Sequence, residues 1–403
     1  MIVRGQSFLG RAWKKNREEI RALLAGHMPR YLVGFSKQAR FAVRGTPVLV
    51  FHVVEPEAFE TQLEFLAENR YRTVDADELE RRCLEGAGNS RSVALTFDDA
   101  DSSFWTYAFP LLKRYGFKAI LFAVSGLVPD DAEVRPNLDD VSNGLASLDE
   151  LRSRAAKQPL CTWRELEEMH ASGRIDIQSH SHSHCRVPVS PLVIDFHHPA
   201  FDTNPVFPAD VPLSVFDDPD RPARRLLPGA PIFENAPRLT GRRRFREDPA
   251  FVEALIGCAS QCGDSRFFER PDWRAQLSRE LSKWPLNRRG EFETTAETTA
   301  GMRREFEQSK LELEAQLPGK RVRHFCFPWY QWCPEAVALA AEAGYTSLWG
   351  GLNLRHGKRW GPNGPVMMQR IPQEYLRCLP GKGRVAASDV WKARIKGLHR
   401  AAV

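Results

Sequence analysis

The chain has 403 residues, of which 42% are hydrophobic and 27% are charged, and its formal net charge at pH 7 is +6. This composition is ordinary for a soluble globular enzyme, and the modest charge without a nucleic-acid-binding motif gives no reason to expect nucleic acid as a partner. No run of about 18 apolar residues is present, which argues against a transmembrane helix. The first residues lack a signal-peptide pattern and the eight cysteines form no CxxC pair, so we expect a cytoplasmic protein with reduced thiols.

Residues 1–45 form a basic N-terminal extension. Its apolar residues fall near helical spacing, which predicts one amphipathic helix. Two interpretations remain open: the helix packs on the main domain with a solvated basic face, or it makes peripheral contact with an anionic membrane, which would place the protein at the inner membrane face.

The next part of the chain alternates between short apolar runs and helical patterns. Strands are predicted at 47–52, 71–74, 93–97, 119–124 and 175–179, and helices at 58–69, from 77, at 104–115 and at 162–173. Residues 129–158 are predicted to form a polar loop. Alternation with short connections is typical of parallel β-α units around a barrel or a wound sheet.

From 187 to 300 the alternation stops and prolines become frequent, which disfavours a continuous helix or a central strand. This segment is interpreted as an insertion of extended loops followed by helices at 249–262 and 272–284. The regular pattern resumes with helices at 302–317 and 335–343 and strands at 324–328, 346–349 and 366–371. The predicted organisation is an extension (1–45), a domain in two parts (46–186 and 301–375) separated by the insertion (187–300), and a basic C-terminal tail (376–403).

Two segments carry the residues most suited to catalysis. The apolar run 93–97 ends in Asp98 and Asp99, and the run 175–179 ends in three histidines at alternate positions, His180, His182 and His184. One carboxylate and two neutral imidazoles are a common ligand set for a catalytic divalent metal, and a second carboxylate is then available as a base for water. The pattern predicts a metal-dependent hydrolase.

These segments resemble the signatures of the polysaccharide deacetylases, the NodB-homology or carbohydrate esterase 4 family. Thr96-Phe97-Asp98-Asp99-Ala100 is similar to the TFDDG motif, and 180–184 is similar to the H-[ST]-x-x-H motif. Residues 325–329 resemble the FAYPYG segment, and 369–372 resemble the final strand of several branches. The resemblance implies an α/β fold, a distorted (β/α)7-type NodB barrel with its large insertion between the second and third motifs.

The resemblance also implies roles for individual residues. Asp99, His180 and His184 would hold a divalent metal, usually zinc in this family, and Asp98 would be the general base. A backbone N–H near Trp329 would stabilise the oxyanion. For His182, metal ligation, an outer supporting role and solvent exposure all remain open. Pro328, Trp329 and Arg370 are assigned to substrate binding, although aromatic residues after the third motif are as often part of a core.

Three positions depart from the family pattern. The late histidine that many members use as general acid is missing, which leaves His52, His324 and His356, of which His52 is the best placed. The arginine that steadies the base has no obvious equivalent, although Arg323 and Arg370 are near. Ala100 replaces a glycine, and a turn with positive φ there would disfavour its Cβ.

The predicted function is removal of an N-acetyl group from an amino sugar in a polysaccharide, an oligosaccharide or a lipid-linked saccharide. Three alternatives stay open: a hydrolase of the same fold that cleaves a non-carbohydrate amide, a catalytically silent sugar-binding module, and a membrane-associated scaffold that relies on residues 1–45.

Overall fold

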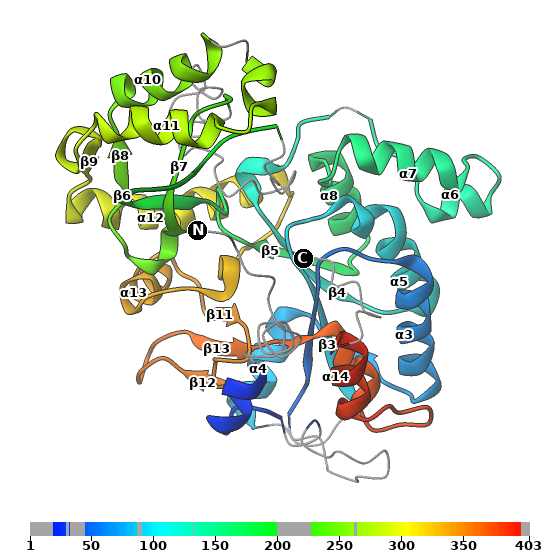
Figure 1. Ribbon diagram of the computed structural model, residues 1–403. Helices are drawn as coiled ribbons and strands as arrows, with labels where there is room; N and C mark the ends of the chain where they lie inside the picture. Colours follow the sequence, from blue (N-terminus) through cyan, green and yellow to red (C-terminus); the bar gives the residue numbers. More distant parts are fainter. Residues whose placement is uncertain are drawn as a thin grey trace. The chain divides into compact units, whose positions relative to one another are not determined.

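The computed structural model describes residues 19–29, 32, 45–86, 91–131, 133–199, 227–261 and 264–395. The chain divides into two compact units, which we describe separately (Figure 1). Unit 1 comprises Met1–His180, Lys310–Tyr330 and Gly344–Val403, and unit 2 comprises Ser181–Ser309 and Gln331–Ala343. These limits differ from the domain boundaries read from the sequence, and which segments fold independently stays a prediction. Within the ranges given, no helix combines the length and apolar character needed to cross a membrane.

Unit 1 is built on a large, mostly parallel sheet. Within the described residues it has ten strands in the order β12-β13-β11-β10-β5-β4-β3-β1-β14, with β2 beside β3, and only the β12–β13 pair is antiparallel. The strands are β1 (Val48–Phe51), β2 (Arg72–Thr73), β3 (Ser92–Phe97), β4 (Ala119–Ala123), β5 (Ile175–Ser179), β10 (His324–Cys326), β11 (Ser347–Gly350), β12 (Lys358–Arg359), β13 (Val366–Gln369) and β14 (Ile371–Pro372). The central strands are buried along their whole length, as expected for a parallel sheet covered on both faces.

The expected closed (β/α)7 barrel is not confirmed. The sheet is an open path, and no strand pairing within the described residues joins its two ends. The segment 366–372 nevertheless contributes a strand near each end of the sheet. Its first strand, β13, pairs with β11, its second strand, β14, pairs with β1, and Arg370 lies between the two in the sequence. The fold class is therefore α/β with a large parallel sheet.

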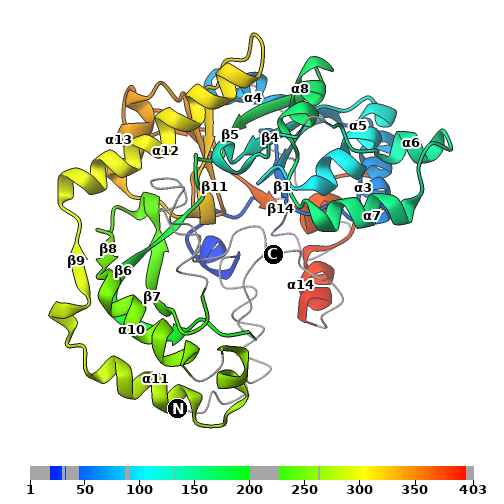
Figure 2. The same cartoon turned by 90° about the horizontal axis from the view of Figure 1, so that it is seen from above.

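Helices lie around the outside of this sheet, as Figure 2 shows for α3, α4, α5 and α8. The helices are α3 (Pro56–Glu68), α4 (Ala76–Glu85), the π-helical turn η1 (Phe104–Ala108), α5 (Phe109–Tyr115), α6 (Leu138–Ser142), α7 (Leu148–Lys157), α8 (Trp163–Ala171) and α14 (Ala387–Ile395). The strands and helices of the sequence prediction are recovered here, most of them within a few residues.

The polar loop expected at 129–158 is a wrong prediction, because α6 and α7 lie within it. Both helices begin at a side-chain cap, Asn137 for α6 and Ser147 for α7. Neither has an apolar stripe wide enough to reveal a helix in the sequence, since α6 buries no residue and α7 buries only Leu151.

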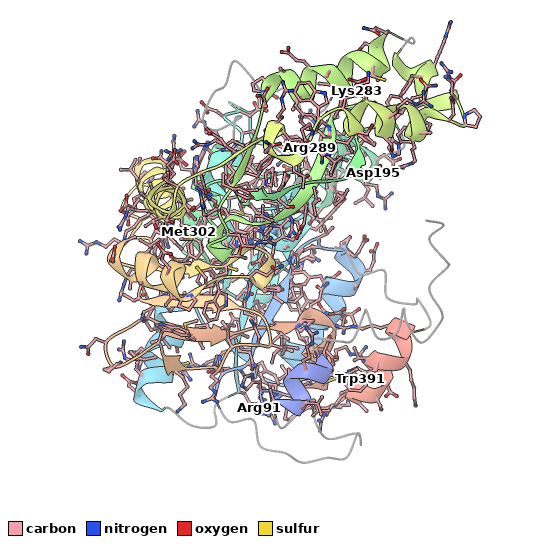
Figure 3. All side chains as sticks on the ribbon, turned by 60° about the vertical axis from the view of Figure 1, so that its left-hand side comes forward. Arg91, Asp195, Lys283, Arg289, Met302 and Trp391 are labelled. Carbon is pink, nitrogen blue, oxygen red and sulfur yellow. The ribbon has the colours of Figure 1, made fainter. Side chains whose placement is uncertain are left out.

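The two ends of the chain are only partly described. Residues 19–24 are helical, but most of the basic extension lies outside the described residues, so the amphipathic helix and its membrane contact stay predictions. At the other end, α14 packs onto the preceding turn, where the indole N–H of Trp391 donates to the hydroxyl of Tyr375 at 2.7 Å (Figure 3).

Unit 2 contains most of the proline-rich insertion. Its elements are β6 (Arg186–Phe196), β7 (Pro231–Pro237), β8 (Phe245–Glu247), α10 (Pro249–Ser260), α11 (Trp273–Ser282), β9 (Gly290–Phe292), α13 (Pro334–Glu342) and α12 (Thr295–Gln316), whose last residues belong to unit 1. The segment from 186 is a long strand rather than the expected loop. Pro188 and Pro191 are tolerated because β7 is the one strand that pairs with β6 among the described residues, so neither proline interrupts a central strand there.

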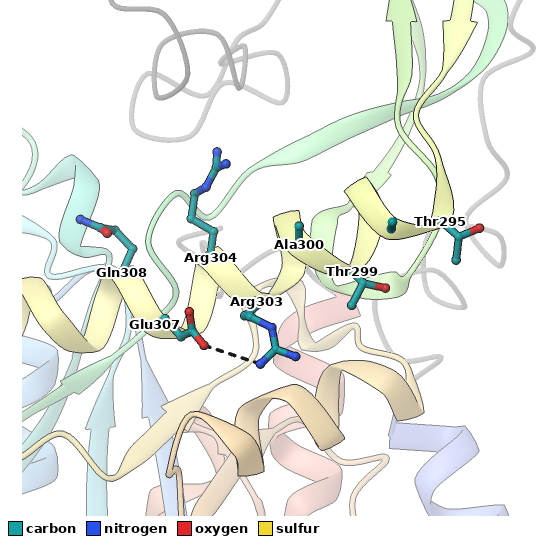
Figure 4. A pocket seen from close by; sticks show the side chains of 8 residues that line it. Thr295, Thr299, Ala300, Arg303, Arg304, Glu307 and Gln308 are labelled. Carbon is teal, nitrogen blue, oxygen red and sulfur yellow. Dashed lines mark ion pairs between the residues drawn. The ribbon is translucent and has the colours of Figure 1, made fainter.

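The core of unit 2 is aromatic. Phe233, Phe245, Phe251 and Phe267 cluster against α10 and α11. Arg289, labelled in Figure 3, donates to the carbonyl oxygens of Trp284 and Pro191 and so ties α11 to β6. One face of α12 carries a shallow pocket, lined by small and charged side chains, in which Arg303 pairs with Glu307 at 3.6 Å (Figure 4).

Candidate active site

The candidate site in unit 1 lies where three parallel strands end. Asp98 and Asp99 follow β3, His180 follows β5, and Phe327 follows β10. Since β10 and β5 are neighbours and only β4 separates β5 from β3, these strand ends meet at one edge of the sheet. A sharp turn after Asp98, with φ of 69° at Asp99 and 55° at Ala100, ends the strand pattern, so that the two carboxylates need not point to opposite faces.

Asp98 is held by Arg370 in a buried pair. The two terminal nitrogens of Arg370 donate to the two carboxylate oxygens at 2.5 and 2.8 Å, and the exposed fractions of the side chains are 0% and 1%. Burial alone would raise the pKa of Asp98, but the guanidinium of Arg370 and the imidazoles of His180 and His52 hold it well below its usual value. Asp98 is therefore ionised and fixed in orientation.

His180 presents a defined ring nitrogen to both carboxylates. Its Nδ1 lies 2.9 Å from the carbonyl oxygen of Cys326, which only accepts, so Nδ1 carries a proton. Its Nε2 then faces Asp99 Oδ1 at 3.3 Å and Asp98 Oδ2 at 3.9 Å.

A cation fits among these atoms. Burial acts to lower the pKa of His180, but Cys326 and the two carboxylates raise it well above its usual value. The negative charge that favours a proton on Nε2 also favours a metal ion between Nε2 and the carboxylates. The Nδ1 hydrogen bond to a backbone carbonyl is also the usual support of a metal-binding histidine. The donor set of Asp99 and His180 therefore fits the expected divalent metal.

His52 is the only one of the three candidate acids placed beside Asp98. Its Nε2 lies 3.7 Å from Asp98 Oδ2, and its side chain is 38% exposed. It also lines an open cavity of about 580 Å³ together with Tyr330. His324 is bonded instead to Ser347 and Asp77, and His356 contacts Cys83.

The third motif forms a strained turn, η7 (Pro328–Tyr330). Trp329 and Tyr330 both have positive φ, 57° and 55°, which is costly for bulky residues and is found where a site demands it. Pro328 is buried and Trp329 is half-buried, so their substrate-binding assignment stays a prediction. The ring of Tyr330 lies 5.1 Å from the guanidinium carbon of Arg370.

Sequence reasoning missed what Arg370, Cys326 and Tyr330 do together. Arg370 was assigned to substrate binding, whereas its buried guanidinium is engaged by Asp98 and by the rings of Phe122 and Tyr330. Cys326 supplies the carbonyl for His180, and its Sγ lies 3.9 Å from Asp98. The signals in the sequence were the position of Cys326 in the third motif and the nearness of Arg370 to the place expected for the arginine that steadies the base.

His184 belongs to unit 2, in the turn that follows directly after His180. The turn is closed by the His184 N–H, which donates to Ser181 Oγ at 2.9 Å, and has φ of 73° at Ser181 and 53° at His184. Glu305 of α12 secures it by accepting from the N–H and the hydroxyl of Ser183 at 2.9 and 2.6 Å. His184 stays a predicted ligand, and His182 is half-buried in the same turn.

The sheet and the carboxylate–histidine cluster at its edge define an α/β protein with an enzyme-type site. Residues 85–192 match the model of the family described as polysaccharide deacetylase. This segment contains both the Asp98–Asp99 and the His180–His184 motifs, so the match confirms the family resemblance over this part of the chain.

Named relatives agree with this assignment. The poly-β-1,6-N-acetyl-D-glucosamine N-deacetylase of Staphylococcus aureus is 27% identical over 129 residues, which are 32% of this chain and 37% of the relative. The protein of the same name from Escherichia coli is 28% identical over 132 residues, 32% of this chain and 18% of the relative. The matches thus span well under half the length of these relatives.

Two solved structures are similar at a lower level. The de-N-acetylase of Aggregatibacter actinomycetemcomitans superposes with a TM-score of 0.45 and 15% identity over 81% of this chain and 94% of that one. The BpsB deacetylase domain of Bordetella bronchiseptica gives 0.45 and 16% over 81% and 95%. Superpositions this loose do not establish a shared fold.

Proposed function

We propose that this protein is a metal-dependent deacetylase that hydrolyses the N-acetyl group of an amino sugar and releases acetate. The observation that carries the proposal is the buried Asp98–Arg370 pair with His180 Nε2 facing both carboxylates. Asp99 and His180 would hold the divalent metal, with His184 as the third ligand on the strength of its place in the motif. Zinc is the metal expected from the resemblance.

A bound metal would supply Lewis acidity for the attacking water and the acetyl carbonyl. Asp98, ionised and oriented by Arg370, takes the proton of the water as a C–O bond forms at the carbonyl carbon. His52, on the exposed side of Asp98, donates a proton to the nitrogen of the leaving amine as the C–N bond breaks. The products are acetate and the free amino sugar, so that one water is consumed for each acetyl group removed.

The relatives' names and the cavity support the proposed substrate class. Both named relatives act on a β-1,6-linked N-acetylglucosamine polymer by their printed names. The cavity of about 580 Å³ lined by His52 is large enough for a sugar residue beside the catalytic groups. We propose that the substrate is an N-acetylhexosamine in a polymer, an oligosaccharide or a lipid-linked saccharide. We also propose a cytoplasmic location, with the basic extension at the inner membrane face.

Two variants test this proposal. Asp99→Asn should lose the metal and the acetate release, whereas Asp98→Asn should keep the metal and lose the acetate release. Asp101→Asn is the matched control, since Asp101 caps the next turn through the N–H of Ser103 at 2.9 Å and should keep both.

The readouts are metal content by mass spectrometry and acetate released from β-1,6- and β-1,4-linked N-acetylglucosamine oligomers and from a lipid-linked N-acetylhexosamine. Metal without acetate from any of these would point to a different amide substrate. A wild-type protein that takes up no metal after reconstitution would favour a silent sugar-binding module instead.

A further inference from the structure

Three soft metal-binding side chains meet in unit 1 outside the active site. Cys83 lies near the end of α4, His356 lies in the loop before β12, and Met368 lies on β13. The Sγ of Cys83 is 3.6 Å from His356 Nε2 and 4.0 Å from the Sδ of Met368. Met368 is fully buried, Cys83 packs against the same core cluster, and none of the three takes part in the proposed hydrolysis.

The loop that carries His356 is shaped to approach Cys83. Gly357 has φ of 69° and is anchored by its N–H, which donates to the carbonyl oxygen of Met367 at 2.9 Å. A Cβ at this position would lie 3.3 Å from both Cβ and Sγ of Cys83, so a side chain here would crowd the cysteine. Glycine therefore allows the loop to bring the His356 ring onto the thiol.

The His356 ring presents one of its nitrogens to the thiol. Its Nε2 lies 3.6 Å from the Sγ of Cys83. A neutral imidazole nitrogen in this position can offer its lone pair to a metal ion.

The spacing of the donor atoms suits a three-coordinate ion. With metal–sulfur and metal–nitrogen bonds of about 2.3 and 2.05 Å at 120°, neighbouring sulfur and nitrogen lie about 3.8 Å apart and two sulfurs about 4.0 Å apart. The observed 3.6 and 4.0 Å match these values closely. Both distances from the Sγ of Cys83 therefore suit an ion that Cys83 shares with His356 and Met368.

We propose that Cys83, His356 and Met368 form a binding site for a soft monovalent metal ion, Cu(I). Thiolate and thioether sulfurs select Cu(I), whereas hard divalent ions prefer oxygen ligands. The thiolate balances the single positive charge, which makes the buried site neutral. The carboxylate of Glu80, on the same helix as Cys83, accepts a hydrogen bond from the hydroxyl of Thr346 at 2.9 Å.

Solvent reaches His356 through a cavity of about 500 Å³. Arg355 and Lys358 line the same cavity and disfavour a divalent cation more than a monovalent one. Binding releases the thiol proton of Cys83 to solvent as the Cu–S bond forms.

The test is an anaerobic Cu(I) titration of the full chain in competition with bicinchoninate, under ascorbate. Wild type should bind one tight equivalent, and X-ray absorption should show two sulfurs and one nitrogen. Cys83→Ser and Met368→Leu should each lower the Cu(I) affinity of this site. Loss of a hydrogen bond that only supports a ligand costs roughly 10–100-fold in metal affinity, and Cys83→Ser should cost more than that. Cys258→Ser is the matched control, because Cys258 is also a half-buried cysteine on a helix, in unit 2.

Both test substitutions conserve size, and urea unfolding of the metal-free variants should show that they remain folded. Equal Cu(I) affinity in Cys83→Ser and Cys258→Ser would overturn the proposal. So would an all-sulfur coordination shell, because it would place the ion on other cysteines.

Discussion

Arg370→Met removes the partner of a buried carboxylate and should cost both stability and activity. The 2.5 and 2.8 Å hydrogen bonds set the charge centres of Arg370 and Asp98 about 4 Å apart, where an effective dielectric constant of about 20 gives about 4 kcal/mol. Breaking a buried pair by removing one partner typically costs about 3–5 kcal/mol. We therefore expect the free energy of unfolding to fall by about 4 kcal/mol, measured by urea denaturation at pH 7.

The activity of each folded molecule of Arg370→Met should also fall, because Asp98 loses the partner that orients it as the base. General base catalysis contributes roughly 10²–10⁴-fold, and we expect a loss in kcat within that range. The double variant Asp98→Asn/Arg370→Met should regain part of the stability but no activity, since it leaves no buried charge uncompensated.

Arg135→Met is the matched control for this prediction. Arg135 forms a similar buried fork with Glu165, at 2.7 and 2.6 Å, so its loss should cost comparable stability. The folded variant should nevertheless keep a kcat near the wild-type value. The reasoning is refuted if Arg370→Met loses under about 1 kcal/mol, or if both variants lose kcat equally at equal folded fraction.

Three further predictions concern other parts of unit 1. His52→Gln should lower kcat on N-acetyl sugars by roughly 10²–10⁴-fold without changing the free energy of unfolding measured in urea. Hydrolysis of p-nitrophenyl acetate should be spared, because its leaving group needs no proton. An equal loss on both substrates would contradict the role of His52 as the acid. Asp176 is half-buried and bonded to Lys320. Burial acts to raise its pKa, but the charges of Lys320 and His324 hold the pKa below the unfolded value, so its stabilisation is present above about pH 4 and fades as pH falls through the folded pKa. Urea denaturation of wild type and Asp176→Asn should therefore show a gap of about 3–5 kcal/mol at pH 7 that narrows at pH 3, and a constant gap would exclude this linkage. Ala100→Gly should stay within about 1 kcal/mol of wild type, because relief of left-handed strain offsets the lost methyl, whereas Ala100→Val should be destabilising by more than about 2 kcal/mol in the same assay.

The alternating part of the sequence predicted the sheet well because its signal is local. Runs such as 93–97 and 119–124 are apolar apart from Thr96, and each is a buried strand with a glycine or polar boundary. Closure of the sheet was not predictable in this way, since it depends on which distant strands pair. The short, polar helices α6 and α7 were missed because they show no apolar face in the sequence. Their ends are instead stabilised by side-chain caps.

The candidate site was predictable where its residues are adjacent in the sequence. Asp98, Asp99 and His180 were found from two motifs, and the structure brings them together. Arg370 was noticed only as an arginine near the expected place, because its partnership with Asp98 spans 272 positions and leaves no periodic trace. Glu305 is a similar case, anchoring the histidine turn from a helix 122 positions away.

Acetate release by the purified full chain, before and after removal of metal by a chelator, tests the central claim most directly. The account predicts that release from an N-acetylglucosamine oligomer stops on chelation and returns with one equivalent of a divalent metal per chain. Undiminished release from a chain shown to be free of metal would contradict it.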